Sequence, residues 1–200
     1  MLTLWCKLSD CSQMSDGGSA LLLCSEAGLR ISSLCPSDAV ELLSSSTCTT
    51  SLYSAPEDLT FLSTCASAAN SAYTEAKVRA SDIDVAEVHD CFTITELLMY
   101  EALQLCSPGS ASAMLRAHET DISGRIPVNT GGGLVGFGHP VGATGVKQVV
   151  EIWRQMKGKC GAYQLQKIPH IGVCANMGGN FRQLAVVYYV VLYFNYLMRR

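Results

Sequence analysis

Three short segments of the sequence carry the side chains and backbone groups best suited to chemistry. They are His89-Asp-Cys-Phe92, Gly138-His-Pro140 and Asn176-Met-Gly178. We expect each on a turn at the end of a buried strand, where open α/β sheets usually build their sites. The sequence therefore places reactive or donor groups, including two imidazoles and a thiol, where such sites are usually built.

Each candidate has a second interpretation that involves no chemistry. The start of the helix expected after Cys91 would lower the pKa of its thiol, but an unpaired cysteine is more often a small buried packing residue. Pro140 restricts the backbone of His139 and can aim its ring out of a glycine-rich turn, although turn histidines often cap neighbouring carbonyls. His118 and His170 are expected at the surface or at a strand edge.

The glycine-rich loop also contains Gly131-x-Gly133-x-x-Gly136, with Glu151 about 20 residues after its first glycine, as in a dinucleotide-binding fingerprint. That motif needs its last glycines at the start of a helix, and we expect the next helix at about Ala143. Nucleotide binding is therefore disfavoured.

The elements that position these segments follow from hydrophobic periodicity and turn residues. One helix is expected to start within residues 54–57 and to run past Tyr73. Two further helices are expected over residues 94–105 and 146–153. A tight turn is expected at residues 176–180. Strands are expected at residues 19–24, 40–49, 83–88, 126–129, 171–175 and 184–191. Strands that alternate with helices and end in a hairpin indicate an α/β layered domain.

Composition narrows the class of protein. The 200 residues are 48% hydrophobic and 16% charged, with a net charge of −3, so a globular core is expected and nucleic-acid binding is disfavoured. The ten cysteines form no Cys-x-x-Cys pair, so structural zinc is not expected and a reducing compartment fits best. The apolar residues 184–198 are fewer than the roughly 17–25 of a membrane helix, and we interpret their first half as a buried strand.

Five ordered motifs resemble the C-terminal half of a thiolase, and most closely the sterol-carrier-protein type. They are Ser15-Asp-Gly-Gly-Ser-Ala20, His89-Asp-Cys-Phe92, Asn129-Thr-Gly-Gly-Gly133, Gly138-His-Pro-Val-Gly-Ala-Thr-Gly145 and Asn176-Met-Gly-Gly179. The resemblance implies a thiolase-like α/β fold with a mixed sheet covered by helices. It divides the chain into residues 1–30 (the end of an N-terminal domain), 31–192 (the C-terminal domain) and 193–200 (an atypical tail).

The resemblance implies an acyl-CoA C-acyltransferase that performs 3-ketoacyl-CoA thiolysis or Claisen condensation in lipid metabolism, such as fatty acid β-oxidation. Cys91 would move the proton, and His139 would donate to the thioester oxygen together with a water held by His89. The backbone N–H of Gly178 would belong to a second oxyanion hole. Where many thiolases have Cys-x-Gly, this chain has Asn176-Met-Gly178, so the acid/base thiol would be Cys91.

The nucleophilic cysteine loop of thiolases has no match in the sequence, so we expect a truncated thiolase half that is inactive alone. The alternative is an inactive fragment that at most binds acyl-CoA. Expected partners are acyl-CoA and coenzyme A as substrates, with no cofactor, metal, nucleic acid or membrane span, and a homo-oligomer is possible. The resemblance implies a mitochondrial or peroxisomal location, although we recognise no targeting signal in the sequence.

Overall fold

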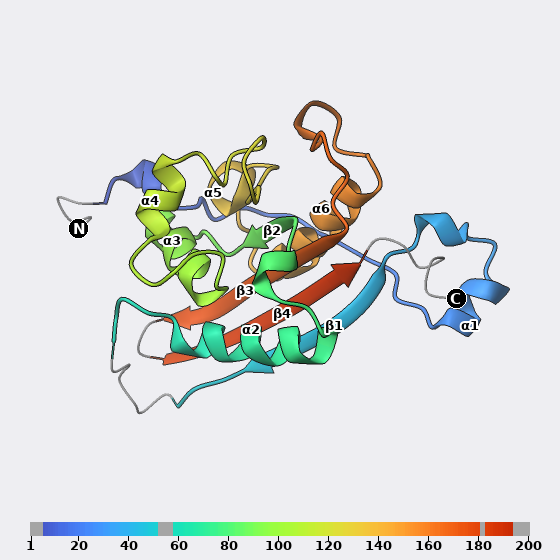
Figure 1. The fold of residues 1–200 in the computed structure, drawn as a ribbon, viewed down its shortest axis with the longest axis horizontal. Helices are drawn as coiled ribbons and strands as arrows, with labels where there is room; N and C mark the ends of the chain where they lie inside the picture. The colour runs from blue at the N-terminus through green and yellow to red at the C-terminus, as the bar shows by residue number, and fades with distance from the viewer. Residues whose placement is uncertain (1–5, 52–57, 181–182, 194–200) are drawn as a thin grey trace.

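The computed structural model describes residues 6–51, 58–180 and 183–193, and the side chains among them up to Gly178 (Figure 1). Within this part, four strands form one sheet: β1 (Glu41–Cys48), β2 (Val85–Val88), β3 (Ile171–Asn180) and β4 (Gln183–Tyr193). Their order is β1-β4-β3-β2. Strand β2 runs parallel to β3, whereas β4 is antiparallel to both neighbours. The expected mixed sheet is confirmed.

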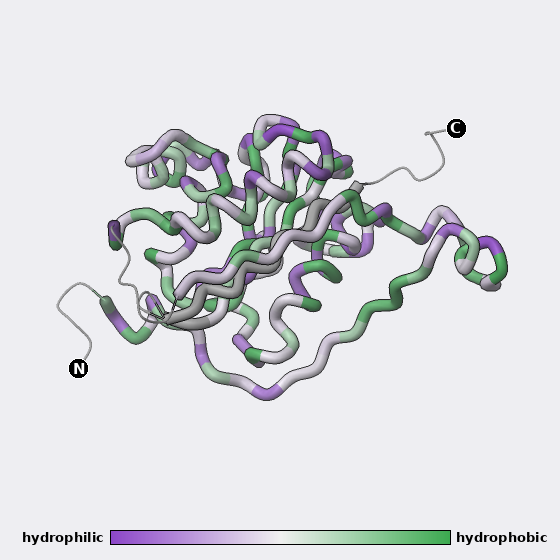
Figure 2. Tube along the Cα trace, turned by 90° about the horizontal axis from the view of Figure 1, so that it is seen from below, coloured by the Kyte–Doolittle hydropathy of each residue, from purple (hydrophilic) through white to green (hydrophobic). Residues whose placement is uncertain are grey.

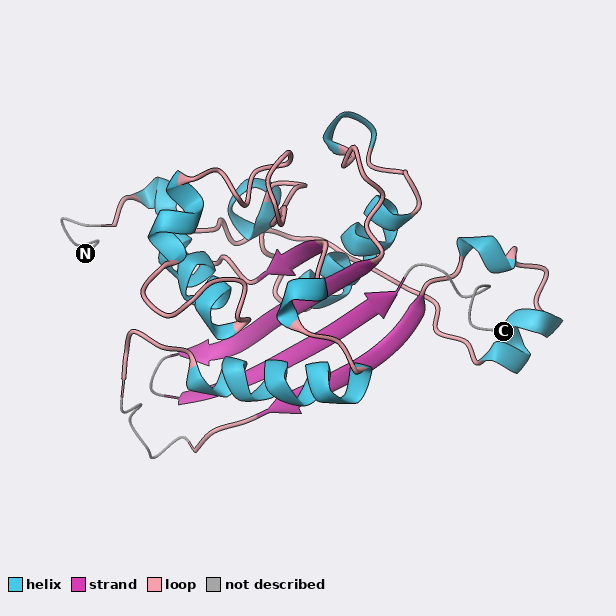
Figure 3. Cartoon of the chain, viewed as in Figure 1, coloured by secondary structure: helices cyan, strands magenta, loops and turns pink. Residues whose placement is uncertain are grey.

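Helices cover both faces of the sheet (Figures 1 and 3). Helix α2 (Ser63–Ala76) packs on β1 and β4, and α6 (Thr144–Met156) packs on β2 and β3 from the other side. The remaining α-helices are α1 (Glu26–Ile31), α3 (Thr93–Ala102), α4 (Ala111–Arg116) and α5 (Gly133–Phe137). Short 3₁₀ helices are η1 (Leu8–Asp10), η2 (Pro36–Asp38), η3 (Ala80–Asp82) and η4 (Gly161–Tyr163).

Small residues let α2 lie close to the sheet. Its buried face consists mainly of Cys65, Ala68, Ala69, Ala72 and Ala76. The buried Tyr73 hydroxyl donates to the Leu103 carbonyl at 2.9 Å, which satisfies a polar group that burial would otherwise leave unpaired.

Helix α6 approaches β3 so closely that one position accepts no side chain. A Cβ on Gly172 would lie 2.4 Å from Ile152 Cγ2. Around this point Val85, Ile152, Met156 and Cys174 form a second buried cluster. Because strand residues alternate between faces, Glu87 and His89 share the α6 side of the sheet with Val85.

The buried face of α6 is unusually polar. Thr144, Gln148, Glu151 and Gln155 are buried. The Gln155 side chain donates to the Thr130 hydroxyl and the Tyr163 carbonyl, both at 2.9 Å, and accepts from the Leu165 N–H at 3.0 Å. Burial of the Gln155 side chain is therefore matched by hydrogen bonds to the loops on either side, whereas the buried Gln148 Oε1 has no hydrogen-bond partner among the described residues.

Two expected strands and one expected turn are wrong. Residues 19–24 form no strand: they lie in the extended segment between η1 and α1, whose hydrophobic stretch runs along the outside in Figure 2. Residues 126–129 make a single bridge, from Val128 to Ala86. The expected turn at residues 176–180 is instead the last part of β3. A strand needs a partner backbone, and hydrophobicity alone does not supply one.

The other expected strands and helices are present. The strands over residues 40–49, 83–88, 171–175 and 184–191 correspond to β1 to β4, and the three helices to α2, α3 and α6. The expected helix start within residues 54–57 and the tail after residue 193 lie outside the described residues. Within the described part, no helix combines the length and apolar character needed to cross a bilayer.

Candidate active site

His89 follows the last residue of β2 and is held by the neighbouring strand. The parallel register pairs Val88 with Ala175, so the next residues, His89 and Asn176, stand side by side. His89 Nδ1 hydrogen-bonds Asn176 Oδ1. Because a carboxamide oxygen only accepts, His89 donates from Nδ1, and Nε2 of the neutral ring is an acceptor.

For His139 we assign the opposite tautomer. Its Nδ1 lies 2.7 Å from the Thr144 hydroxyl, which can also donate to the Pro140 carbonyl at 3.1 Å. That carbonyl already accepts the N–H groups of Ala143 and Thr144. The hydroxyl proton is therefore best used toward His139 Nδ1, which leaves Nε2–H of the neutral ring as a donor.

The two imidazoles meet edge to face, with ring centroids 5.1 Å apart and an interplanar angle of 85°. Burial lowers the pKa of His89 to about 4 and also lowers the pKa of His139. Both rings are therefore neutral near pH 7, one presenting a hydrogen-bond acceptor at Nε2 and the other a donor.

Cys91 lies two residues after His89 and is partly buried. Its Sγ is 4.0 Å from the Thr95 hydroxyl. Burial raises the pKa of its thiol and outweighs the lowering by hydrogen bonds from Thr95 and the Phe92 backbone, so the lower pKa expected at the helix start is wrong. Among the described contacts, Cys91 meets Thr95 and the N-terminal segment rather than either imidazole.

Asp90 joins the end of β2 to the glycine-rich loop. Its carboxylate accepts the N–H of Leu134 at 2.7 Å and that of Val135 at 3.4 Å, at the start of α5. Gly133 (φ 58°) leaves it room, because a Cβ there would lie 2.2 Å from Asp90 Oδ2. Gly133 and Gly136 thus lie in a short helix, contrary to expectation, but a carboxylate already occupies the position where a phosphate would bind.

Gly178 lies on β3 two residues beyond Asn176 and therefore on the same face of the sheet. A Cβ at this position would meet no atom within 4 Å, so the space beside it is open. The structure thus brings His89 and His139 together, with Asn176 and Thr144 as their partners. Cys91 and Gly178 lie on the same elements as these groups, without a described contact to the imidazoles.

Sequence reasoning gave no role to the positioning residues Asp90, Thr144 and Asn176. All three stand inside the quoted motifs: Asp90 is next to His89 and Cys91, Asn176 is two positions before Gly178, and Thr144 is five positions after His139. The signal for these residues was that polar residues occur in the same motifs as glycines that no turn requires. Gly145, for example, leaves room for Asn176, because a Cβ at Gly145 would lie 2.9 Å from Asn176 Nδ2.

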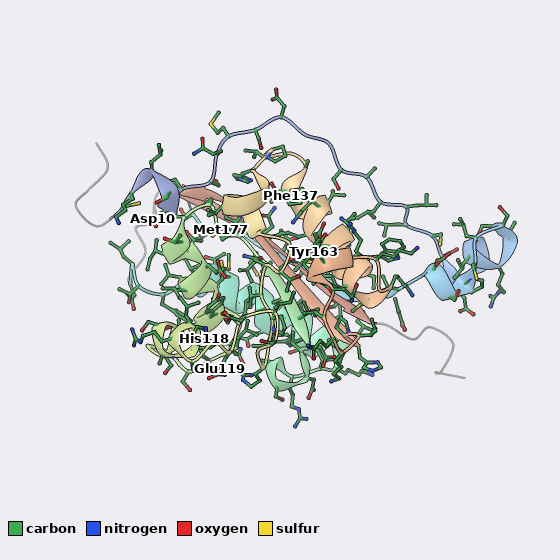
Figure 4. All side chains as sticks on the ribbon, turned by 90° about the horizontal axis from the view of Figure 1, so that it is seen from above. Asp10, His118, Glu119, Phe137, Tyr163 and Met177 are labelled. Atoms are coloured by element: carbon green, nitrogen blue, oxygen red, sulfur yellow. The ribbon has the colours of Figure 1, made fainter. Side chains whose placement is uncertain are left out.

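The rim of this site is apolar and exposed. Phe92 is 43%, Phe137 58% and Val141 73% exposed. Figure 4 shows Phe137 on the side of the molecule along which the extended segment runs. Lys147 Nζ lies 4.4 Å from the centre of the Phe137 ring and 3.6 Å from the buried carboxylate of Glu87, which fixes this wall to β2.

A hollow of about 470 Å³ lies elsewhere, between residues 58–61, α3 and the start of α4. Its lining is mostly apolar, with Phe61, Ile94 and Leu97 among its residues and Asp58 and Glu101 as its carboxylates. Neither histidine of the candidate site contributes to it.

Comparison with known proteins agrees with this architecture. Residues 45–190 match the family described as thiolase C-terminal domain-like. The chain is 37% identical over 180 residues to the acetyl-CoA acetyltransferase of Methanothermobacter thermautotrophicus, which covers 90% of this chain and 46% of that protein.

Two further relatives are a thiolase subunit and a sterol carrier protein. Benzoylsuccinyl-CoA thiolase subunit BbsB of Thauera aromatica is 31% identical over 175 residues, 88% of this chain and 45% of that protein. Sterol carrier protein 2 of Bos taurus is 37% identical over 160 residues, 78% of this chain and 29% of that protein. The chain therefore spans about half or less of the length of these relatives.

Among solved structures, an Ltp2-ChsH2(DUF35) aldolase superposes with a TM-score of 0.79 at 19% identity. The superposition covers 98% of this chain and 50% of that one. At this level of identity, the match concerns the fold alone.

Proposed function

The chain belongs to the thiolase family, and from this premise we propose that it supplies the proton-transfer half of an acyl-CoA C-acyltransferase site. The nucleophilic thiol of that site would come from polypeptide beyond these 200 residues. The observation that carries the proposal is the pair of neutral imidazoles, whose ring centroids lie 5.1 Å apart. With the tautomers assigned above, His139 Nε2 is a donor and His89 Nε2 is an acceptor.

This pair suits the chemistry of a thioester enolate. Making or breaking the bond next to a thioester carbonyl places negative charge on its oxygen, which hydrogen-bond donors stabilise. His139 Nε2–H would donate directly, and a water that donates to His89 Nε2 would use its other proton for the same oxygen. Neutral rings serve here, since a protonated imidazole would lose its proton to the enolate.

Cys91 is the proposed proton carrier. Its raised pKa keeps it as a thiol near pH 7, which suits the step in which the enolate carbon takes up a proton. Gly178 N–H would add a donor to a second oxyanion hole. The substrates would be an acyl-CoA and coenzyme A, in a reaction of lipid metabolism such as fatty acid β-oxidation, with no further cofactor.

The exposed apolar rim supports a site that is completed by a ligand or by another polypeptide. Phe92, Phe137 and Val141 present apolar surface beside the imidazoles, and apolar surface of this kind usually marks a contact with a ligand or a partner. The alternative is an inactive fragment that at most binds acyl-CoA. It is favoured by the lack of a described contact between Cys91 and either imidazole.

A chimera separates the two proposals. In the chimera, this chain replaces the matching half of the Methanothermobacter acetyl-CoA acetyltransferase and is joined to the N-terminal half of that enzyme. Coenzyme-A-dependent cleavage of a 3-ketoacyl-CoA is then measured. We expect turnover by the chimera and none by the chain alone, because covalent catalysis needs a nucleophile that holds the acyl group. A folded but inactive chimera would favour the inactive fragment.

Variants of the chimera then test the roles. Cys91→Ala should lower the rate by about 10²–10⁴, as expected for a lost proton-transfer group. His139→Ala should cost about 10²–10³, as expected for a lost oxyanion donor. Cys106→Ala, at another partly buried cysteine, is the matched control and should leave the rate unchanged. Wild-type turnover by Cys91→Ala would remove Cys91 from the mechanism.

A further inference from the structure

Two thiols that the candidate site does not use lie together in the N-terminal segment. Cys6 and Cys11 flank η1, and their sulfur atoms are 3.9 Å apart. Both thiols point at the Lys7 carbonyl, at 3.8 Å from Cys6 and 3.6 Å from Cys11. Both side chains are partly exposed, so small molecules can reach them.

This pair is attached to the strand end that carries Cys91. Cys11 forms an antiparallel bridge with Phe92, and the Ser12 N–H donates to the Cys91 carbonyl at 2.9 Å. The pKa of Cys11 is raised, first by burial and then by the neighbouring Cys6 thiol, with a smaller contribution from Cys91. The three thiols therefore belong to one neighbourhood.

We propose that Cys6 and Cys11 are a modification site that forms a reversible disulfide by exchange with a small-molecule disulfide such as oxidised glutathione. The Cys6 thiolate attacks one sulfur of glutathione disulfide, which forms a mixed disulfide and releases one glutathione thiolate. The Cys11 thiolate then attacks the Cys6 sulfur and releases the second. The two cysteines are oxidised, glutathione disulfide is reduced, and the two thiol protons end on two glutathione molecules.

Geometry selects this pair over the other cysteines. Among the described side chains, this is the one pair of sulfurs within hydrogen-bond reach of each other. Cys65, Cys160 and Cys174 are buried, and Cys35 instead contacts the Ser37 hydroxyl at 2.9 Å. A disulfide needs its sulfurs at about 2 Å, so the pair must close by roughly 2 Å.

Trypsin gives a direct test, because Lys7 lies between the two thiols. The full chain is equilibrated in glutathione buffers with an increasing oxidised fraction, trapped with N-ethylmaleimide, digested without reduction and analysed by mass spectrometry. We expect residues 1–7 linked to residues 8–30, with the linked species growing with the oxidised fraction and lost on reduction. Residues 8–30 also contain Cys24, so the linked species must persist in Cys24→Ser and disappear in Cys11→Ser.

Three results would overturn the proposal: glutathione on both thiols without a link, a link that survives Cys11→Ser, or a dominant link from residues 8–30 to the Cys91 peptide, residues 80–116. Unfolded protein in urea is the reference, and the Cys6–Cys11 link must form in higher yield in the folded chain. The experiment detects a covalent bond, so its outcome is independent of turnover by the chimera.

Discussion

The end of β2 and the extended segment between η1 and α1 differ in how their groups are satisfied: the first is buried and hydrogen-bonded, and the second is exposed and apolar. At the end of β2, buried backbone groups have side-chain partners: Val88 N–H donates to Asn129 Oδ1 at 2.8 Å, and Leu134 N–H donates to Asp90 Oδ1 at 2.7 Å. In the extended segment, Leu22 is 76% and Leu23 73% exposed. Apolar side chains there face solvent.

This contrast shows which geometry the chain determines by itself. The positions of His89 and His139 follow from contacts between β2, β3, α5 and α6. The extended segment instead presents an apolar run with the composition of a strand and no strand beside it, which favours association with another polypeptide. The three predictions below test this difference.

The largest effect is expected where Asp90 meets the glycine-rich loop. Gly133→Ala would place a Cβ 2.2 Å from Asp90 Oδ2 at a residue with φ 58°. Overpacking and the left-handed backbone together should lower the free energy of unfolding by about 3 kcal/mol. Urea-induced unfolding measures the change.

Gly136→Ala is the matched control in the same helix. A Cβ there meets no atom within 4 Å, and the backbone has no positive φ. Alanine should therefore match the parent or stabilise it by up to about 1 kcal/mol. Equal losses in the two variants would mean that the loop is not anchored through Asp90.

A second effect concerns the pH dependence of stability. Burial raises the pKa of Glu87 from 4.5 to about 8, although Lys147 opposes the shift. A raised pKa means that the folded state keeps a proton that the unfolded state loses, so this stabilisation is full below pH 4.5 and is lost as pH rises toward 8. The slope of the unfolding free energy against pH should correspond to the release of one proton on unfolding.

The variant Glu87→Gln isolates this contribution. Relative to Glu87→Gln, the parent should lose about 2 kcal/mol of unfolding free energy from about pH 6 to about pH 7.5. Replacing the exposed Glu75 by Gln should give a flat difference over the same range. A flat difference for Glu87→Gln as well would show that Glu87 ionises normally in the folded chain.

The smallest effect on stability is expected in the extended segment. Leu22→Ser should change the free energy of unfolding by less than about 0.5 kcal/mol, because the side chain is exposed. Binding of a hydrophobic dye and self-association should decrease. Ile122→Ser, at an exposed residue elsewhere, should leave dye binding unchanged. A large loss of stability in Leu22→Ser would show that this segment contributes to the folded core.

Sequence patterns predicted the helices and strands that pack against neighbouring elements or are buried in the core. The strand and helix around His89 are present because hydrophobic periodicity reports burial directly. Residues 19–24 were misassigned because the same apolar run describes a strand with or without a partner. Helix α5 was missed because glycine disfavours helices, whereas here Asp90 satisfies its first N–H groups. The expected boundaries at residues 30 and 192 stay predictions.

The candidate site was predictable by residue type and less so by arrangement. His89 and His139 stand out in the sequence, and the structure brings them together. Their hydrogen-bond partners, Asn176 and Thr144, follow from strand register and helix start rather than from spacing. The pKa of Cys91 was predicted in the wrong direction, because sequence shows the helix start but not the degree of burial.

The strand order has a consequence for synthesis. β4 is synthesised after the other three strands of the described sheet, yet it lies between β1 and β3, and Glu41 pairs with Tyr193. Translation adds about 5–20 residues per second, so β1 remains without this neighbour until β4 has been synthesised. During this interval the edge of β1 is open to chaperones or to other nascent chains, and the sheet can form only after β4 has been synthesised.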